Sequence, residues 1–247
     1  MIQLRTPDEV EAIRKAGKIV AVILNELKGM AKPGVSTARL NERAEKVIER
    51  WGGKPAFKGY KGFPASICTS INEVIVHGIP SRRKISDGDI ISIDVGVELD
   101  GYFADAALTI GVGDISDEAR RLIAVTEESL KIGIGQTRIG KRISDVSSSI
   151  QRFVESEGFS VVRAFVGHGI GTRMHEEPEI PNFGRPGVGA RLEKGMVFAI
   201  EPMVNQGVYE VEVLSDGWTA VTKDRKLSAH FEHTVAITDS EAEVLTR

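Results

Sequence analysis

The chain has 247 residues, with 32 Lys and Arg against 35 Asp and Glu, a formal net charge of −3 at pH 7. At roughly 150 residues per domain, this length fits one large domain or two fused halves. The small acidic excess, without a long basic run, argues against direct binding to a nucleic-acid backbone. The single cysteine, Cys68, excludes an internal disulfide or a cysteine zinc cage, so any metal site must use His, Asp and Glu.

The predicted elements begin with a helix that opens at Thr6-Pro7 with Glu9 as a capping partner and stops at Pro33-Gly34. A second helix follows and ends near Gly52-Gly53. Short β-rich runs come next, at residues 65–71, 74–77 and 89–97. The N-terminal stretch does not resemble a signal peptide, and no run approaches the about 18 apolar residues of a membrane span. We therefore expect a cytoplasmic protein with no membrane contact.

The same order of elements is then repeated at an offset of about 107 residues. Ser116-Asp117-Glu118 opens a helix as Thr6 did, and another amphipathic helix is closed by Gly158. The strand that leads from Gly88 to Asp94 is echoed by the strand that leads from Gly195 to Glu201. This repetition predicts a duplicated unit with pseudo-twofold symmetry. The second half carries roughly sixteen extra residues, which include 172–186, and such an insertion is often functional.

Several carboxylates lie next to apolar runs that are predicted to form buried strands, at positions where an apolar residue would be expected. Asp94, Glu201 and Glu232 each adjoin an apolar run, and a buried carboxylate is costly unless a cation or strong donors compensate it. Asp94 and Asp105 lie on the two arms of a predicted hairpin. A four-residue turn at 98–101 would place them directly opposite each other, where a shared metal ion removes their repulsion.

One histidine is expected to join these acids. His168 lies in the glycine-lined segment Val-Gly-His-Gly-Ile-Gly, where an imidazole can approach a site closely. Four carboxylates and one imidazole suit Mn, Fe(II), Co or Zn, and they can bridge two ions about 3.5 to 4 Å apart. The pattern therefore predicts a two-metal hydrolytic site with the ligands Asp94, Asp105, His168, Glu201 and Glu232.

Taken together, the motifs resemble the type I (bacterial) methionine aminopeptidases over essentially the whole chain. The motifs that carry the resemblance are His77-Gly-Ile-Pro80, Asp94-Val-Gly with Asp105, Gly167-His-Gly-Ile-Gly171, His175-Glu-Glu-Pro178, Ile200-Glu-Pro202 and Phe231-Glu-His-Thr234. The resemblance implies an α+β, duplicated "pita-bread" fold of the creatinase/aminopeptidase type, in which helices cover a curved, largely antiparallel sheet. It also implies one catalytic domain, 1–247, with halves at approximately 1–110 and 111–247.

The resemblance also implies an activity. The enzyme would remove the initiator methionine from nascent, deformylated polypeptides when the second residue is small, by attack of a metal-bridging water or hydroxide on the first peptide bond. It assigns Glu201 as proton carrier, His175 as hydrogen-bond donor to the carbonyl oxygen and His77 as partner of the substrate amide. Its cofactors would be two divalent ions among Co, Mn, Fe(II), Zn and Ni.

Matching positions supply a methionine pocket and a monovalent-cation site. The predicted pocket residues are Tyr60, Phe63, Cys68, His77, Met174, His175 and Trp218. Phe63 and Met174 depart from the tyrosine and phenylalanine that the resemblance leads us to expect. Cys68 is interpreted as a pocket-lining thiol, because no motif supplies it with an activating base. A Na or K ion would be bound by Asn72, Val74 and Ser228.

Two alternatives compete with this hypothesis. One is another hydrolase of the same fold, such as an X-Pro aminopeptidase, and the other is a non-catalytic binding protein. The apolar pocket disfavours an X-Pro aminopeptidase, and the complete ligand set disfavours a non-catalytic binding protein. The resemblance further implies a monomer with a transient ribosome contact. His230 and His233 flank Glu232 and are expected to support it.

Overall fold

The computed structural model describes residues 2–239 and 241–247. Its helices are α1 (Pro7–Met30), α2 (Thr37–Arg50), α3 (Asp117–Gln136) and α4 (Ile143–Ser156), with a short 3₁₀ turn, η1 (Tyr60–Gly62). The predicted capping box of α1 is confirmed, because the Thr6 hydroxyl accepts from Glu9 N at 3.3 Å and the Glu9 carboxylate accepts from Thr6 N at 2.8 Å. Ser116 caps α3 through Ala119 N at 3.1 Å.

The strands form one long, mainly antiparallel sheet and two small ones. The long sheet contains β1 (Lys54–Pro55), β2 (Ile67–Ile71), β4 (Ile90–Leu99), β5 (Tyr102–Gly111), β7 (Gly167–Gly169), β8 (Glu176–Ile180), β9 (Val197–Ile200), β14 (Glu232–Ile237) and β15 (Ala242–Val244). The small sheets contain β6 (Ser160–Val161), β10 (Met203–Asn205) and β13 (Ser228–His230), and β3 (Val74–Val76), β11 (Val211–Val213) and β12 (Ala220–Thr222).

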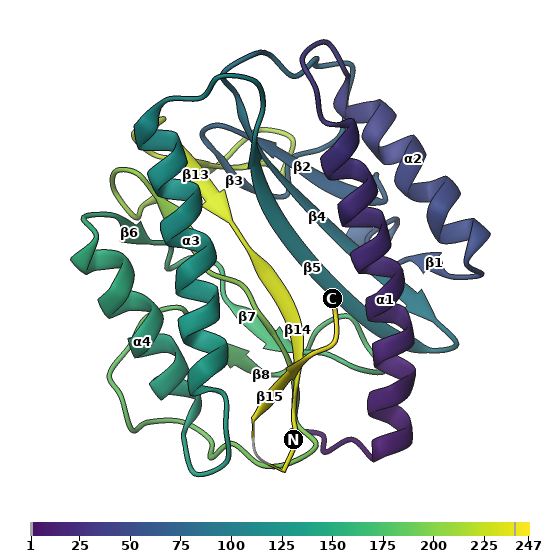
Figure 1. Ribbon diagram of the computed structural model, residues 1–247, viewed down its shortest axis with the longest axis vertical. Helices are drawn as coiled ribbons and strands as arrows, with labels where there is room; N and C mark the ends of the chain where they lie inside the picture. Colours follow the sequence, from purple (N-terminus) through teal and green to yellow (C-terminus); the bar gives the residue numbers. More distant parts are fainter. Residues whose placement is uncertain (1, 240) are drawn as a thin grey trace.

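The long sheet joins the two halves of the chain. Its order is β1-β4-β5-β14-β9-β7-β8, with β2 also on β4 and β15 on β14. Figure 1 shows the helices on one face of it, α1 and α2 over the β4–β5 side and α3 and α4 over the other side. Each pair buries its own apolar cluster, one around Ile13 and Leu40 and the other around Leu122 and Phe198. The opposite face is left for side chains from several strands.

Backbone details repeat between the halves. Gly88 and Gly195, which precede β4 and β9, both have φ of +87°, a value that glycine adopts without strain. Isolated bridges also match, Ser36 with Lys84 and Arg142 with Arg191. These correspondences support the duplicated unit, while the division at residues 110 and 111 stays a prediction. Part of the extra segment of the second half forms β8, which extends the sheet beside β7.

The predicted register of the β4–β5 hairpin is wrong. Asp94 pairs with Ala107, and Asp105 pairs with Gly96. The turn is Asp100-Gly101, whose φ values of 51° and 84° suit a two-residue hairpin turn that matches the twist of the strands. Asp94 and Asp105 are therefore diagonal neighbours on the same face of the sheet, because Asp94 and Gly96 are two residues apart.

None of the helices in the described part of the chain has both the length and the apolar character needed to cross a membrane.

Candidate metal centre and active site

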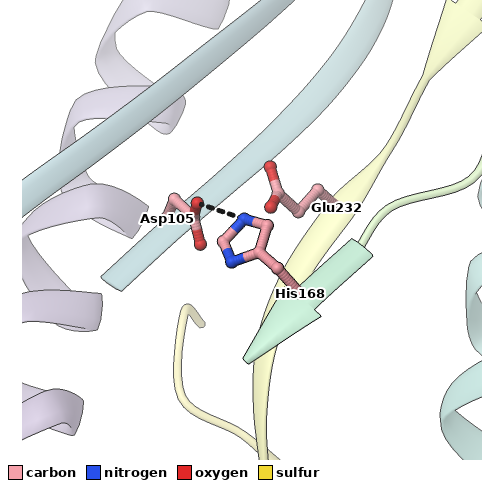
Figure 2. A group of neighbouring side chains, drawn as sticks. All are labelled: Asp105, His168 and Glu232. Atoms are coloured by element: carbon pink, nitrogen blue, oxygen red, sulfur yellow. Dashed lines mark ion pairs between the residues drawn. The ribbon is translucent and has the colours of Figure 1, made fainter. Parts of the chain in front are cut away.

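The predicted ligands converge from separate strands on one cavity of about 150 Å³. Asp94 comes from β4, Asp105 from β5, His168 from β7 and Glu232 from β14, and Glu201 directly follows β9. Ligand atoms of Asp105, His168 and Glu232 all lie within 4.8 Å of one another. Figure 2 shows these three side chains directed toward a common point.

Small residues between the ligands leave room for this convergence. Ala107 on β5 pairs with Asp94 on one side and with Glu232 on the other. In the same way, Ala199 on β9 pairs with His168 and with Thr234. Because an alanine methyl fills little of the space above the sheet, the flanking carboxylates and the imidazole can lean toward one another. The two halves thus use the same small-residue device.

Burial and mutual repulsion act together on the acids. Burial, with the charge of Asp105 added to it, raises the pKa of Asp94 and of Glu232 well above the ordinary range. Burial likewise raises the pKa of Glu201, and Asp105 and Asp94 add to that effect. When all of these carboxylates are ionised, their burial and mutual repulsion are unfavourable. A cation bound between them would stabilise the ionised cluster.

His168 is oriented to face the acids. Burial alone would lower its pKa, but the hydrogen bond and charge of Asp105 and the charge of Glu201 raise it to about 9. Its Nε2 lies 3.5 Å from Asp105 Oδ2 and 3.6 Å from Glu201 Oε1. Its Nδ1 lies 2.9 Å from the Gly169 carbonyl oxygen, to which it donates in the tautomer that leaves Nε2 free to bind a metal.

The donor set fits divalent metal ions. Within residues 2–239 and 241–247, Asp94 Oδ1 is buried and has no hydrogen-bond partner. A buried oxygen of this kind needs a partner, and a metal ion would provide one. Burial, followed by the charges of Asp94 and Glu232, raises the pKa of the Cys68 thiol well above its ordinary value. The thiol therefore stays protonated, and the available ligands are carboxylates and one imidazole, a set typical of hydrolytic metal sites.

Thr234 holds Asp105, one of the candidate ligands, in place. The Thr234 hydroxyl donates to the Asp105 main-chain carbonyl at 2.8 Å and lies 3.2 Å from Asp105 Oδ1, and it accepts from Asp105 N at 3.1 Å. It therefore ties β14 to β5 beside the cavity. Supporting groups of this kind orient metal ligands.

The two flanking histidines behave differently. His230 is buried, with its Nε2 3.9 Å from Glu201 Oε2 and unpartnered in the described chain, so it faces the ligands as expected. His233 does not face them. Its Nδ1 lies 2.8 Å from the Thr246 hydroxyl, on the side of the sheet that the helices cover. The expectation for His233 was wrong because side chains alternate along β14, and Glu232 already occupies the cavity face.

Two further histidines, His77 and His175, line the cavity. The ring centroids of His175 and His168 are 4.1 Å apart. Desolvation by the surrounding protein atoms and the charge of His168 lower the pKa of His175 to about 4, so its ring is neutral at pH 7. His77 has a φ of +59° and contacts Phe165 and Trp218 edge to face, and burial lowers its pKa.

The predicted methionine-pocket residues lie in the same cavity. Phe63 packs against Trp218 with 5.2 Å between ring centroids, and Cys68 and Met174 are buried beside them. An apolar wall of this kind suits a thioether side chain. The volume of the cavity equals that of roughly five liquid waters, which is suitable for one amino-acid side chain.

Phe57 and Lys61 also line the cavity, and the sequence reasoning missed both. Phe57 lies over Gly96, where an added Cβ would come within 2.5 Å of its ring. Lys61, with a φ of +48°, lies in the turn that presents Tyr60, and its Nζ is 5.4 Å from the Tyr60 ring centroid. The sequence signal that could have identified them is their closeness in the chain to Tyr60, a predicted pocket residue.

The predicted monovalent-cation residues lie apart from the residues that line the cavity. The Asn72 carbonyl accepts from Ser228 N at 2.9 Å, so these two residues are adjacent, and Val74 begins β3 nearby in the chain. The Ser228 hydroxyl donates to Asn205 Oδ1 at 2.8 Å. Binding of a Na or K ion here stays a prediction.

Comparison with known proteins now adds to this geometry. The model of metallopeptidase family M24 matches residues 11–239. A methionine aminopeptidase from Clostridium perfringens is 54% identical over 246 residues, which are 100% of this chain and 99% of that protein. Methionine aminopeptidase 1 of Bacillus subtilis is 53% identical over 247 residues, which are 100% of both chains.

A solved structure agrees with these sequences. The crystal structure of a methionine aminopeptidase from Thermotoga maritima superimposes with a TM-score of 0.99 at 47% identity, and the match covers 100% of both chains. The predicted pita-bread fold, with its curved antiparallel sheet and covering helices, is thereby confirmed. The chain belongs to metallopeptidase family M24 and, within it, to the type I methionine aminopeptidases.

Proposed function

We propose that this enzyme removes the N-terminal methionine from nascent polypeptides whose second residue is small, and that two divalent metal ions are its cofactors. One observation carries the proposal: the five metal-ligand candidates, His77, His175 and the apolar pocket residues all line a single cavity. The similar methionine aminopeptidases support the choice of substrate.

Asp94, Asp105, His168, Glu201 and Glu232 would hold the ions. Bound there, divalent ions would polarise the scissile carbonyl and lower the pKa of water toward neutrality. Mn, Co, Fe(II), Zn and Ni all accept this donor set. A cation held there would also offset the repulsion that, together with burial, raises the pKa of Asp94, Glu201 and Glu232.

Glu201 would carry the proton. It follows β9 at the edge of the cavity and lies beside His168 Nε2 at 3.6 Å. In the proposed reaction its carboxylate accepts a proton from the attacking water and delivers it to the nitrogen of the leaving amine. The substrate carbonyl is left as a developing oxyanion that needs a donor.

His175 would be that donor. Its ring is neutral at pH 7, and its Nδ1 lies 3.0 Å from the Tyr60 hydroxyl. When the hydroxyl donates to Nδ1, the proton of the imidazole is on Nε2, where it can donate to the carbonyl oxygen. His77, held between Phe165 and Trp218, would bind the substrate amide.

The methionine side chain would enter the apolar part of the cavity between Phe63, Cys68 and Trp218. When the side chain of the N-terminal methionine is bound there, the first peptide bond of the substrate would lie beside Glu201 and His175. The ribosome contact and the monomeric state stay predictions from the family resemblance, and the cytoplasmic location stays a prediction from the sequence.

Release of methionine from Met-Ala-Ser by enzyme loaded with Mn(II) or Co(II) tests the proposal, with Ala-Pro-Ser as the competing substrate. We expect cleavage of the first peptide only. Glu201→Gln should fold and lose at least about a hundredfold in kcat, whereas the exposed Glu193→Gln should match the wild type. Absence of methionine release with metal shown to be bound, or turnover by Glu201→Gln near the wild-type rate, contradicts the proposal.

A further inference from the structure

A buried ion pair links the start of the chain to the loop that carries His175. Arg5, which precedes α1, donates from Nη2 to Glu176 Oε2. The side chains of Arg5 and Glu176 are only 6% and 4% exposed. Glu176 opens β8, in the segment that the second half has and the first half lacks. The two residues thus join opposite halves of the chain next to the cavity.

The Glu176 carboxylate organises the loop in front of it. Its Oε1 accepts from Thr172 N at 2.9 Å, from Arg173 N at 3.0 Å and from the Thr172 hydroxyl at 3.1 Å. These bonds close the turn between β7 and β8, and His175 is the residue immediately before Glu176. With Oε1 occupied by the loop, Oε2 is the atom left for Arg5.

Arg5 is itself fixed at two places. Its backbone N donates to the Gly195 carbonyl at 2.7 Å, at the start of the strand that leads to Glu201. Its guanidinium lies directly over Gly171, where a Cβ would overlap it. A weaker contact, 3.8 Å, reaches Glu9 on α1. The backbone bond to Gly195 therefore anchors Arg5 independently of the loop that it pairs with, whereas Gly171 belongs to that loop.

We propose that Arg5 is a positioning residue that holds His175 over the cavity through Glu176. The inference rests on the proposed function, because it uses the hydrogen bond from His175 to the substrate carbonyl. A buried, charged and geometrically constrained pair can fix a loop closely. Displacement of a reacting group by about 1 Å can cost about a hundredfold in rate. Loss of the Arg5–Glu176 pair should therefore lower kcat, although neither residue contacts the substrate.

Arg5→Met tests this with activity and metal binding measured side by side. We expect kcat on Met-Ala-Ser to fall by about ten- to a hundredfold, with KM and the dissociation constant for Mn(II) unchanged. Arg14→Met is the matched control: Arg14 also pairs with a carboxylate, Glu243 at 3.1 Å, but this partner is on β15 and not in the loop that carries His175. It should keep the wild-type kcat. Equal losses in kcat and in Mn(II) affinity would overturn the proposal.

A double-mutant cycle separates positioning from a general structural effect. In the His175→Ala background, Arg5→Met should lower kcat no further, because the group that it positions is gone. A further loss of the same size would show that Arg5 acts by another route. His175→Ala alone tests the proposed function: if it leaves kcat unchanged, the role of His175 fails, and this result is distinct from additivity in the cycle.

Two conservative variants and one spectroscopic signal complete the test. Arg5→Lys keeps the charge and should recover most of the lost kcat, while Glu176→Gln keeps an acceptor for the loop and should behave like Arg5→Met. If Arg5→Met folds poorly, Arg5→Lys and Glu176→Gln still allow the proposal to be tested. In metal-free protein, histidine-selective NMR should show a shifted or broadened His175 imidazole in Glu176→Gln and an unchanged His77. An unchanged His175 signal would refute the proposal.

Discussion

The imidazole of His175 stacks on the ring of Tyr60, with 5.2 Å between centroids and an interplanar angle of 17°. Its Nδ1 also lies 3.0 Å from the Tyr60 hydroxyl oxygen. Tyr60 therefore controls both the orientation of the ring and the nitrogen that carries its proton.

Tyr60→Phe should keep the stacking and lose the hydrogen bond. Because the proton of His175 is then free to occupy either nitrogen, we expect kcat on Met-Ala-Ser to fall by about tenfold with little change in KM. Tyr102→Phe on β5, away from the cavity, provides the control and should match the wild type. A Tyr60→Phe enzyme with full kcat would disprove the role of the hydroxyl.

His77→Asn should affect activity and pH-dependent stability in separate ways. Asparagine tolerates the left-handed φ of +59° at this position, so the backbone is preserved. Loss of the imidazole should lower kcat/KM by about a hundredfold.

The sign of the pH effect follows from the lowered pKa of His77. Burial holds the folded-state pKa below 6.5, so the neutral ring adds stability above pH 6.5 that is lost as the pH falls through the folded pKa. Wild type should therefore lose stability relative to His77→Asn as the pH drops below 6.5, and the difference should be constant above it. Urea unfolding of metal-free protein at several pH values measures this. A difference that does not change with pH contradicts it.

Metal removal should destabilise the protein, because a metal ion held by the candidate ligands would bind only their folded arrangement. At about 100 times its dissociation constant, Mn(II) should add about 2.7 kcal/mol to the free energy of unfolding. Asp94→Asn should lose most of this gain. Glu98→Gln, on the same strand but paired with Lys54 at 3.0 Å, should retain it. Thermal unfolding with and without chelator is the measurement, and an equal shift in both variants would exclude Asp94 as a ligand.

Two glycine substitutions should have opposite effects. A Cβ at Gly96 would come within 2.5 Å of the Phe57 ring, so Gly96→Ala should cost about 1–3 kcal/mol of stability and raise KM by displacing a cavity wall. Gly135 lies in α3, where an added Cβ would meet no other part of the described chain within 4 Å beyond its own stretch of helix, and Gly135→Ala should stabilise by about 0.5–1 kcal/mol. Equal effects in denaturant unfolding would contradict the assignment of Phe57 to the wall.

Local patterns predicted most of the fold. The Thr6 and Ser116 caps and the apolar runs that lead to Asp94 and Glu201 are short-range signals, and the structure contains the caps and forms strands from both runs. The β4–β5 register was mistaken because the choice between a two-residue and a four-residue turn depends on whether Asp100 adopts a positive φ. The dipeptide Asp100-Gly101 is itself a signal for the two-residue turn, and the prediction of a four-residue turn passed over it.

Long-range contacts were the harder part of the site. The ligand set was readable because buried acids are rare and costly, so their positions stand out. Arg5 and Glu176 each look like ordinary surface residues in sequence, and only the docking of the two halves buries them together. The direction of His233 likewise depends on the face that β14 presents, which the strand itself does not decide.

The place of β14 in the sheet has a consequence for how the molecule matures. β14 lies between β5 and β9 and supplies Glu232, so within the long sheet the strands of the first half are not linked by strand pairing to β9 and β7 until this late segment has been made. Contacts between segments so distant in sequence form slowly. A partly synthesised chain therefore has neither the bridged sheet nor the complete ligand set, and peptidase activity appears only when the last major strand is inserted.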